Sequence, residues 1–167
     1  MKKILCLSLL ALLFACTSAP KPVPVDIAAE EEAIKEVFDV LFSSIKDRNI
    51  DQLASVFTTD GVFMGTSPDE VFTKDSLVAA WTQMMQIPEI TPFEFISEPL
   101  IRIQPDGKTA VVAQQYYWKL LSPIPLRQTF CLVKSDSVWL IDFFDFSFIP
   151  YNNQVPLLNK AVSAEKE

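Results

Sequence analysis

The sequence predicts an α+β domain in which three helices precede a long antiparallel meander and pack on one face of a curved sheet. Apolar residues recur at helical spacing from Ile27 to about Asn49. Beyond Pro88 the segments up to Pro150 are instead strand-like and separated by turn residues. Half of the 167 residues are apolar, which suits one domain with its own core.

The first 15 residues have the layout of a bacterial export signal. Two lysines precede an apolar run from Ile4 to Ala15, which is too short for a comfortable membrane span. The stretch "LFAC" that ends at Cys16 resembles the lipobox of bacterial lipoproteins, in which the cysteine is acylated and becomes the mature N-terminus. An ordinary cleaved signal with an incidental cysteine is the alternative. We therefore expect a cell-envelope protein attached to a membrane by lipid rather than by charge.

A tether and the helices follow the signal. Residues 16–27 include three prolines and no hydrophobic periodicity, so they predict an extended tether. The first helix has acids in its first turns, where they interact favourably with the helix dipole. Asn49 and Gln52 form a capping-box pattern that begins a short second helix, which ends near Phe57. The third helix spans residues 74–87 and stops before Pro88.

The rest of the domain, residues 28–150, is predicted to be strands. Short strands are expected around residues 62–65 and just before the third helix, and long ones over residues 92–103, 109–121, 126–134 and 138–149. The last hairpin has two registers. A three-residue loop, Ser135–Ser137, is favoured and places Arg127 opposite Asp145, whereas a two-residue loop turns Arg127 to the other face. The tail, residues 151–167, is expected to be polar and loose.

Composition excludes several kinds of chemistry. The chain has no histidine, which removes Ser-His-Asp triads and histidine-based metal sites, so we expect neither a metal nor a cofactor. Cys131 is left alone in an apolar strand once Cys6 and Cys16 are assigned to the signal and the lipid. The formal net charge of −7 and the lack of a basic cluster argue against nucleic acid as a partner.

The order of these elements resembles the SnoaL-like branch of the nuclear transport factor 2-like superfamily. The features that carry the resemblance run from about Ile34 to Pro150 and are "NIDQLASVFTTDGVFMGT", "FTKDSLVAAW", "RQTFCLVK" and "VWLIDFFDFS". The resemblance implies a cone-shaped fold, with a strongly curved antiparallel sheet packed on three N-terminal helices and a pocket between them. Where relatives often have a histidine two residues before the final serine, this chain has Asp145 before Ser147.

Strand alternation predicts which side chains reach the pocket. Asp145 shares its face with Trp139, Ile141 and Phe143 and is expected to point into the cone. There it would act as a general acid or base if the protein is an enzyme, with Tyr116 or Tyr117 donating to an oxyanion. The predicted pocket comprises Phe63, Trp81, Met85, Phe95, Tyr116, Trp118, Arg127 and Asp145, with Arg127 available for an anionic ligand. Alternatively, Asp145 bonds Arg127 and the aromatic residues are simply core.

Three functions remain open. The favoured one is binding of a small, largely apolar molecule without turnover. The second is an isomerase or cyclase that uses Asp145, and the third is an envelope assembly module. The other face of the last strand, with Leu140, Asp142, Phe144 and Phe146, is predicted to lie on the outer side of the sheet and to pair two chains as a homodimer. The alternative cover for this face is the tail from Tyr151 to Leu158.

Overall fold

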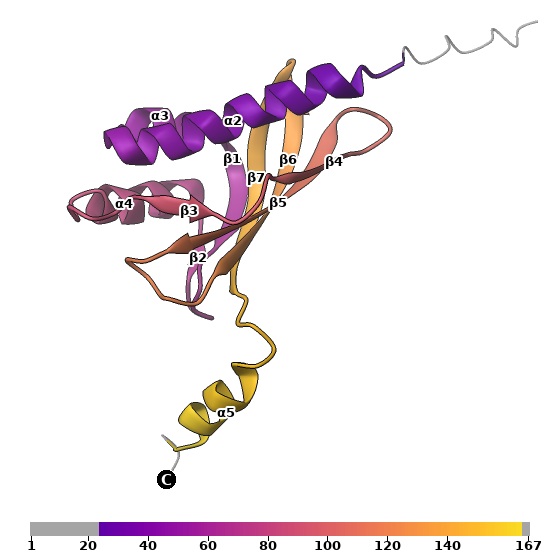
Figure 1. The fold of residues 1–167 in the computed structure, drawn as a ribbon. Helices are drawn as coiled ribbons and strands as arrows, with labels where there is room; N and C mark the ends of the chain where they lie inside the picture. Colours follow the sequence, from indigo (N-terminus) through magenta and orange to yellow (C-terminus); the bar gives the residue numbers. More distant parts are fainter. Residues whose placement is uncertain (1–23, 165–167) are drawn as a thin grey trace, which may run out of the picture.

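The computed structural model describes residues 24–164, so the export signal, Cys16 and most of the tether lie outside the described residues. It shows the predicted α+β architecture (Figure 1). Its elements are α2 (Ile27–Asp47), α3 (Ile50–Ser55), β1 (Phe57–Met64), β2 (Val71–Phe72), α4 (Lys74–Met84), β3 (Phe93–Phe95), β4 (Leu100–Ile103), β5 (Thr109–Trp118), β6 (Leu126–Ser135), β7 (Val138–Phe148) and α5 (Val155–Ala164).

The sheet has seven strands in the order β2-β1-β7-β6-β5-β3, and β4 also pairs with β5. All neighbours are antiparallel except β1 and β7, which are parallel, so the sheet is mixed rather than purely antiparallel. The strand predicted over residues 92–103 is two strands, β3 and β4, which pair with successive parts of β5. Helices α2, α3 and α4 lie together on one side of the curled sheet (Figure 1), and we call that side the inner face.

Local sequence explains how the helices are placed. Asn49 accepts a hydrogen bond from the Gln52 N–H at 3.0 Å and caps α3 as predicted. Arg48 ends α2 in the left-handed conformation, and its guanidinium donates to the Met85 carbonyl at the end of α4 at 2.6 Å. This contact ties the end of α2 to the end of α4, and α3 packs against both helices.

The β6–β7 hairpin has the two-residue turn. Ser135 pairs with Val138, and Asp136 and Ser137 between them have φ values of 48° and 73°. Positive φ at both turn residues defines the type I′ turn, whose twist suits a β-hairpin. The prediction of a three-residue loop is therefore wrong. Asp136 and Ser137 occupy the two turn positions at which Asn-Gly is the common pair.

A β-bulge at Asp142 resets the alternation of the last strand. Leu132 pairs with Ile141 and Cys131 pairs with Phe143, so Asp142 has no partner opposite it on β6. Beyond the bulge, inward and outward positions exchange. Trp139 and Ile141 point inward as predicted, but so do Phe144, which is 3% exposed, and Phe146.

Two predicted orientations are consequently wrong. Asp145 pairs with Thr129 and lies on the outer face, so it does not point into the cone. Phe144 and Phe146 pack in the interior instead of forming the outer patch, and Phe143 takes the outer position. The cause is the one extra residue in β7, which shifts every later side chain to the opposite face.

Contacts from β1 stabilise the bulge. The Thr58 hydroxyl donates to the Asp142 carboxylate at 2.8 Å, which gives this half-buried acid a partner. Gly61 packs directly against the Asp142 carbonyl oxygen, an approach that a residue with a side chain would obstruct. The parallel β1–β7 pairing also shifts register between Phe57 and Val62, so both strands are irregular at the same level.

Glu30 fastens the start of α2 to the β6–β7 hairpin. Its carboxylate accepts hydrogen bonds from the Lys134 ammonium at 2.6 and 2.7 Å and from the Trp139 indole N–H at 2.8 Å. The bond from Lys134, and secondarily the bond from Trp139, lowers the pKa of Glu30 below its ordinary value of 4.5. The sequence alone indicated only that Glu30 is an acid in the first turns of the helix, where it interacts favourably with the helix dipole.

We expect Glu30→Gln to lower the free energy of unfolding by about 1.5 kcal/mol at pH 7, because a charged acceptor of two donors is lost. Since the folded pKa lies below the unfolded one, this stabilisation is complete above pH 4.5 and disappears as the pH falls through the folded value. Urea unfolding from pH 7 to pH 3 measures both effects, with Glu89→Gln, an exposed substitution, as the control. A variant as stable as the wild type at pH 7 contradicts the assignment.

The tail forms a helix rather than a loose segment. Helix α5 has no buried residue and packs against no other helix or strand of the described chain, and Figure 1 shows it standing apart from the sheet. The Tyr151 and Tyr117 hydroxyls share a hydrogen bond of 2.9 Å where the tail leaves the domain. Within residues 24–164, α5 therefore does not cover the outer face of the sheet.

Candidate functional site

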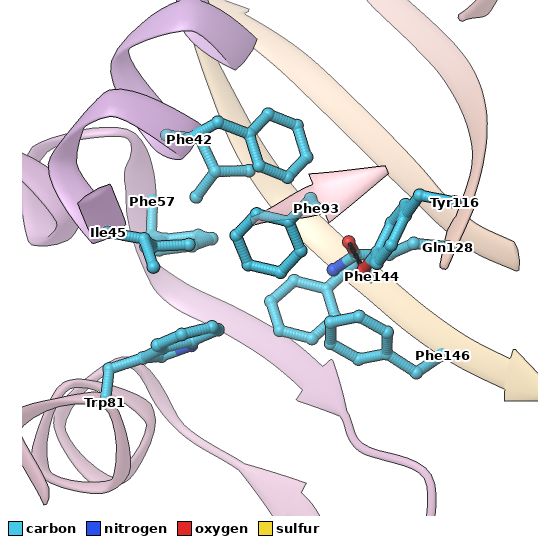
Figure 2. A pocket seen from close by; sticks show the side chains of 10 residues that line it. Phe42, Ile45, Phe57, Trp81, Phe93, Tyr116, Gln128, Phe144 and Phe146 are labelled. Carbon is cyan, nitrogen blue, oxygen red and sulfur yellow. Dashed lines mark hydrogen bonds between the residues drawn. The ribbon is translucent and has the colours of Figure 1, made fainter. Parts of the chain in front are cut away.

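The interior of the cone contains a narrow inner cavity of about 10 Å³, with an almost wholly apolar surface (Figure 2). That volume suits no more than about one water molecule. Side chains from α2, α4 and five strands surround it, namely Leu41, Phe42, Ile45, Phe57, Trp81, Phe93, Tyr116, Gln128, Phe144 and Phe146. Aromatic rings thus fill most of the space between helices and sheet.

A larger space, which we call the chamber, adjoins the inner cavity. It has a volume of about 140 Å³ and is partly open to solvent. The two spaces share Trp81, Phe144 and Phe146 as lining residues. The rest of the chamber is lined by Gly65, Thr66, Glu70, Phe72, Leu77, Ala80, Met84, Trp118 and Leu121.

Two tryptophans form one side of the chamber. The Trp81 and Trp118 rings stack with centroids 6.0 Å apart and planes inclined by 16°. Trp118 is fixed by its indole N–H, which donates to the Ile90 carbonyl at 2.7 Å, and Trp81 projects from the middle of α4. The chamber is therefore bounded on this side by two stacked, largely buried indole rings.

The polar groups of the interior are already bonded. The Tyr116 hydroxyl donates to the Gln128 side-chain oxygen at 3.0 Å. Burial raises the pKa of Tyr116 far above its ordinary value, because a phenolate would be poorly solvated there. Tyr116 therefore stays a neutral hydrogen-bond donor at every physiological pH.

Glu70 is the carboxylate that lines the chamber among the described residues. It accepts hydrogen bonds from the backbone N–H groups of Thr66, at 2.7 Å, and Ser67, at 3.0 Å. These bonds close the turn between β1 and β2. One oxygen of the carboxylate, Oε2, is thus held by the turn at the chamber rim.

A third space, the lateral groove, lies on the other side of the inner cavity between α2 and the β3–β4 segment. Its volume is about 720 Å³, and Phe38, Phe42, Phe93 and Phe95 provide its aromatic surface. Its remaining lining residues are Glu32, Lys35, Glu36, Asp39, Ser43, Lys46, Thr91, Pro92, Ser97, Glu98, Pro99 and Gln114. The groove is therefore apolar at depth and charged at the rim.

The structure divides the predicted pocket residues among four environments. Trp81, Tyr116 and Trp118 line the interior spaces, whereas Phe95 lines the lateral groove. Phe63 and Met85 are packed in the core and line none of these spaces. Arg127 and Asp145 lie on the outer face, and each has a neighbour there.

Those outer neighbours are close in the sheet. With the Gln115 amide turned so that its oxygen faces Arg127, the guanidinium donates two hydrogen bonds to that oxygen, at 3.1 and 3.2 Å. Asp145 accepts a hydrogen bond from the Ser147 hydroxyl at 2.9 Å. Arg127 pairs across the strands with Ser147 and not with Asp145, so the expected Arg127–Asp145 pair is also wrong.

Sequence reasoning missed several lining residues. Phe144 and Phe146 were assigned to the wrong face because of the bulge, for which the sequence carries no clear signal. Gln128 alternates with Leu126, Phe130 and Leu132 along β6, so its place on the inner face was detectable. Glu70 and Leu121 sit in turns, where periodicity gives no orientation.

Comparison with known proteins identifies the class. A model of the SnoaL-like domain family matches residues 34–152, and the chain belongs to this family. No curated protein is similar enough in sequence to be matched. Within the described residues, no helix combines the length and the apolar character needed to cross a membrane.

Solved structures support the same fold. An uncharacterised protein with a cystatin-like fold from Caulobacter vibrioides is 18% identical, with a TM-score of 0.62, over 78% of this chain and 99% of that one. An NTF2-like protein from Cytophaga hutchinsonii is also 18% identical, with a TM-score of 0.59, over 71% and 98%. A candidate dehydratase of the NTF2-like family from Streptomyces avermitilis is 10% identical, with a TM-score of 0.61, over 73% and 97%. At these identities the likeness concerns the fold alone.

Proposed function

We propose that this SnoaL-like domain binds a small, largely apolar molecule in the chamber without turning it over. The observation that carries the proposal is the chamber itself, about 140 Å³ lined mainly by aromatic and aliphatic side chains. An engineered apolar cavity of about 150 Å³ takes up benzene, so this volume is enough for a ring of that size. Burial of such a molecule against Trp81 and Trp118 supplies the affinity.

The arrangement of ionisable groups favours binding over proton transfer. Asp145 lies on the outer face, and Tyr116 and Gln128 are bonded to each other in the interior. Glu70, the carboxylate at the chamber rim, is bonded to two backbone N–H groups. A general base must reach the proton that it removes. Asp145 is on the opposite face of the sheet from the chamber, and the Oε2 atom of Glu70 is held by the turn.

The chamber makes a direct prediction. Titration with benzene is expected to change the tryptophan fluorescence of the protein saturably, because Trp81 and Trp118 line the site. Ala80→Phe places a ring in the chamber from α4 and is expected to abolish the change. Trp139, which bonds Glu30 outside the chamber, gives a constant background. A titration without saturation, or one identical in Ala80→Phe, rules out the chamber as the binding site.

The envelope location is part of the proposal and depends on acylation of Cys16. The lipid and the tether would then hold the domain near a membrane. The supporting observation is the order of signal, lipobox-like stretch and proline-containing tether in the sequence. Metabolic labelling with a radioactive fatty acid tests it in a bacterial host. If the Cys16→Ser variant still incorporates the label, Cys16 is not the lipidated residue.

We also propose a homodimer through the outer face, now defined by different residues. Val62, Val111 and Val133 lie there with Leu140 and Phe143, and Val62 is 46% exposed. Covering these apolar side chains favours a symmetric pair of sheets. Sedimentation of residues 24–164 is expected to show a dimer at tens of micromolar, and Phe143→Glu is expected to make it monomeric. A wild-type monomer under these conditions contradicts the pairing.

A further inference from the structure

The lateral groove, the inner cavity and the chamber form a row through the cone. Phe42 and Phe93 line both the groove and the inner cavity. Trp81, Phe144 and Phe146 line both the inner cavity and the chamber. Figure 2 shows Phe42 on one side of the inner cavity and Trp81 and Phe146 on the other, with Phe93 between them. The inner cavity therefore lies between the groove and the chamber. The three spaces define a path through the cone that is interrupted by the side chains they share.

Side chains, and not backbone, close this path at the groove end. The Phe42 and Phe93 rings meet edge to face with centroids 5.4 Å apart, and both residues are only half-buried. Half-buried side chains change rotamer without breaking hydrogen bonds of the sheet. Rotation of these two rings is the movement that would join the groove to the interior.

The two ends of the path differ in polarity. The chamber end is mainly apolar and has the Glu70 carboxylate at its rim, whereas the groove is lined by six charged side chains and the buried amide of Gln114. Carboxylates outnumber ammonium groups at the rim, where Glu32, Glu36, Asp39 and Glu98 face Lys35 and Lys46. Lys35 is already paired with Glu32 at 2.6 Å. With a formal net charge of −7 on the chain, an anionic group is disfavoured at this rim.

From this arrangement we infer that the ligand is an elongated amphiphile with an uncharged polar head. Its apolar chain occupies the chamber and crosses the inner cavity when the Phe42 and Phe93 rings turn aside, and its head lies in the lateral groove among the rim side chains. The inference rests on the proposed function and extends it, because the chamber alone accepts only a molecule of about the size of benzene. The row of spaces lets a longer chain add buried methylenes.

A homologous series of primary alcohols tests this inference. Tryptophan fluorescence is titrated with 1-hexanol, 1-octanol, 1-decanol and 1-dodecanol, and affinity is expected to rise about fourfold per methylene beyond six carbons. Decanoate is expected to bind more weakly than 1-decanol. An affinity that stops rising at six carbons overturns the inference of an elongated ligand. If benzene still binds in that case, the proposed function of the chamber stands. Tighter binding of decanoate overturns the uncharged head.

Two variants locate the path. Phe93→Trp enlarges the ring between groove and inner cavity and is expected to reduce 1-decanol affinity at least tenfold. The loss of benzene affinity is expected to be much smaller, since Phe93 reaches the chamber only through its contact with Trp118 at a centroid distance of 5.3 Å. Phe42→Leu, a smaller change at a half-buried position, is expected to speed association of 1-decanol without affecting benzene. Phe143→Trp on the outer face is the matched control. Unchanged 1-decanol binding in Phe93→Trp together with unchanged association in Phe42→Leu contradicts passage between these rings.

Discussion

Phe144→Ala is expected to lower the free energy of unfolding by about 3–5 kcal/mol, the usual cost of removing a fully buried phenylalanine ring. Phe144 is 3% exposed, and its ring contacts those of Phe63 and Phe146 at centroid distances of 5.1 and 5.3 Å. Those neighbours belong to β1 and β7, so they cannot readily collapse into the space that is left. Urea unfolding monitored by circular dichroism measures the loss.

The adjacent residue supplies the control. Phe143→Ala removes the same side chain from the outer face, and we expect a loss of about 1 kcal/mol for the monomer. Without the bulge at Asp142 the two residues would exchange faces, and the ranking of the two variants would reverse. A Phe143→Ala variant less stable than Phe144→Ala would falsify the bulge.

Gly61→Ala is expected to destabilise the protein by about 1–3 kcal/mol through overpacking. A Cβ at this position would lie 2.5 Å from the Phe63 ring and 2.7 Å from the Asp142 carbonyl oxygen. The ring is the end of a side chain and has some freedom, but the carbonyl belongs to the bulge and moves only with the backbone of β7. The substitution therefore acts on the feature that turns Phe144 and Phe146 inward.

Thr59→Ala, an exposed change in the same strand, is the control and is expected to change stability by less than about 0.5 kcal/mol. The same urea series measures both variants. Gly61→Ala should also weaken benzene binding, because displacement of β7 moves two residues of the chamber lining. Wild-type stability in Gly61→Ala would show that the close approach to Asp142 is not needed.

Much of the fold was accessible from the sequence because its signals are local. Helical periodicity located α2, the Asn49–Gln52 pattern located the start of α3, and Pro88 marked the region where α4 ends. The fold class and the order of elements followed from these signals and from strand alternation. The parallel pairing of β1 with β7 did not, because it joins distant segments and no short-range pattern specifies it.

The site was less predictable because strand orientation depends on counting residues without interruption. One extra residue at Asp142 reversed every later assignment in β7, including Asp145. The register of the β6–β7 hairpin was also predicted wrongly. Asp136 and Ser137 adopt positive φ, and neither is the glycine that usually marks such a turn in a sequence. Trp81, Tyr116 and Trp118 lie on the inner side, where regular alternation puts them, because α4 and β5 have no irregularity along their length.

The most direct test of the chamber is a crystal structure of the protein purified from its source organism without organic solvent. We expect electron density for an apolar chain bounded by Trp81, Trp118 and Phe146, continuing between Phe42 and Phe93 toward the lateral groove. Mass spectrometry of the same sample should identify one bound molecule per chain. A chamber that contains only ordered water, with no molecule released on denaturation, would contradict ligand binding by this domain.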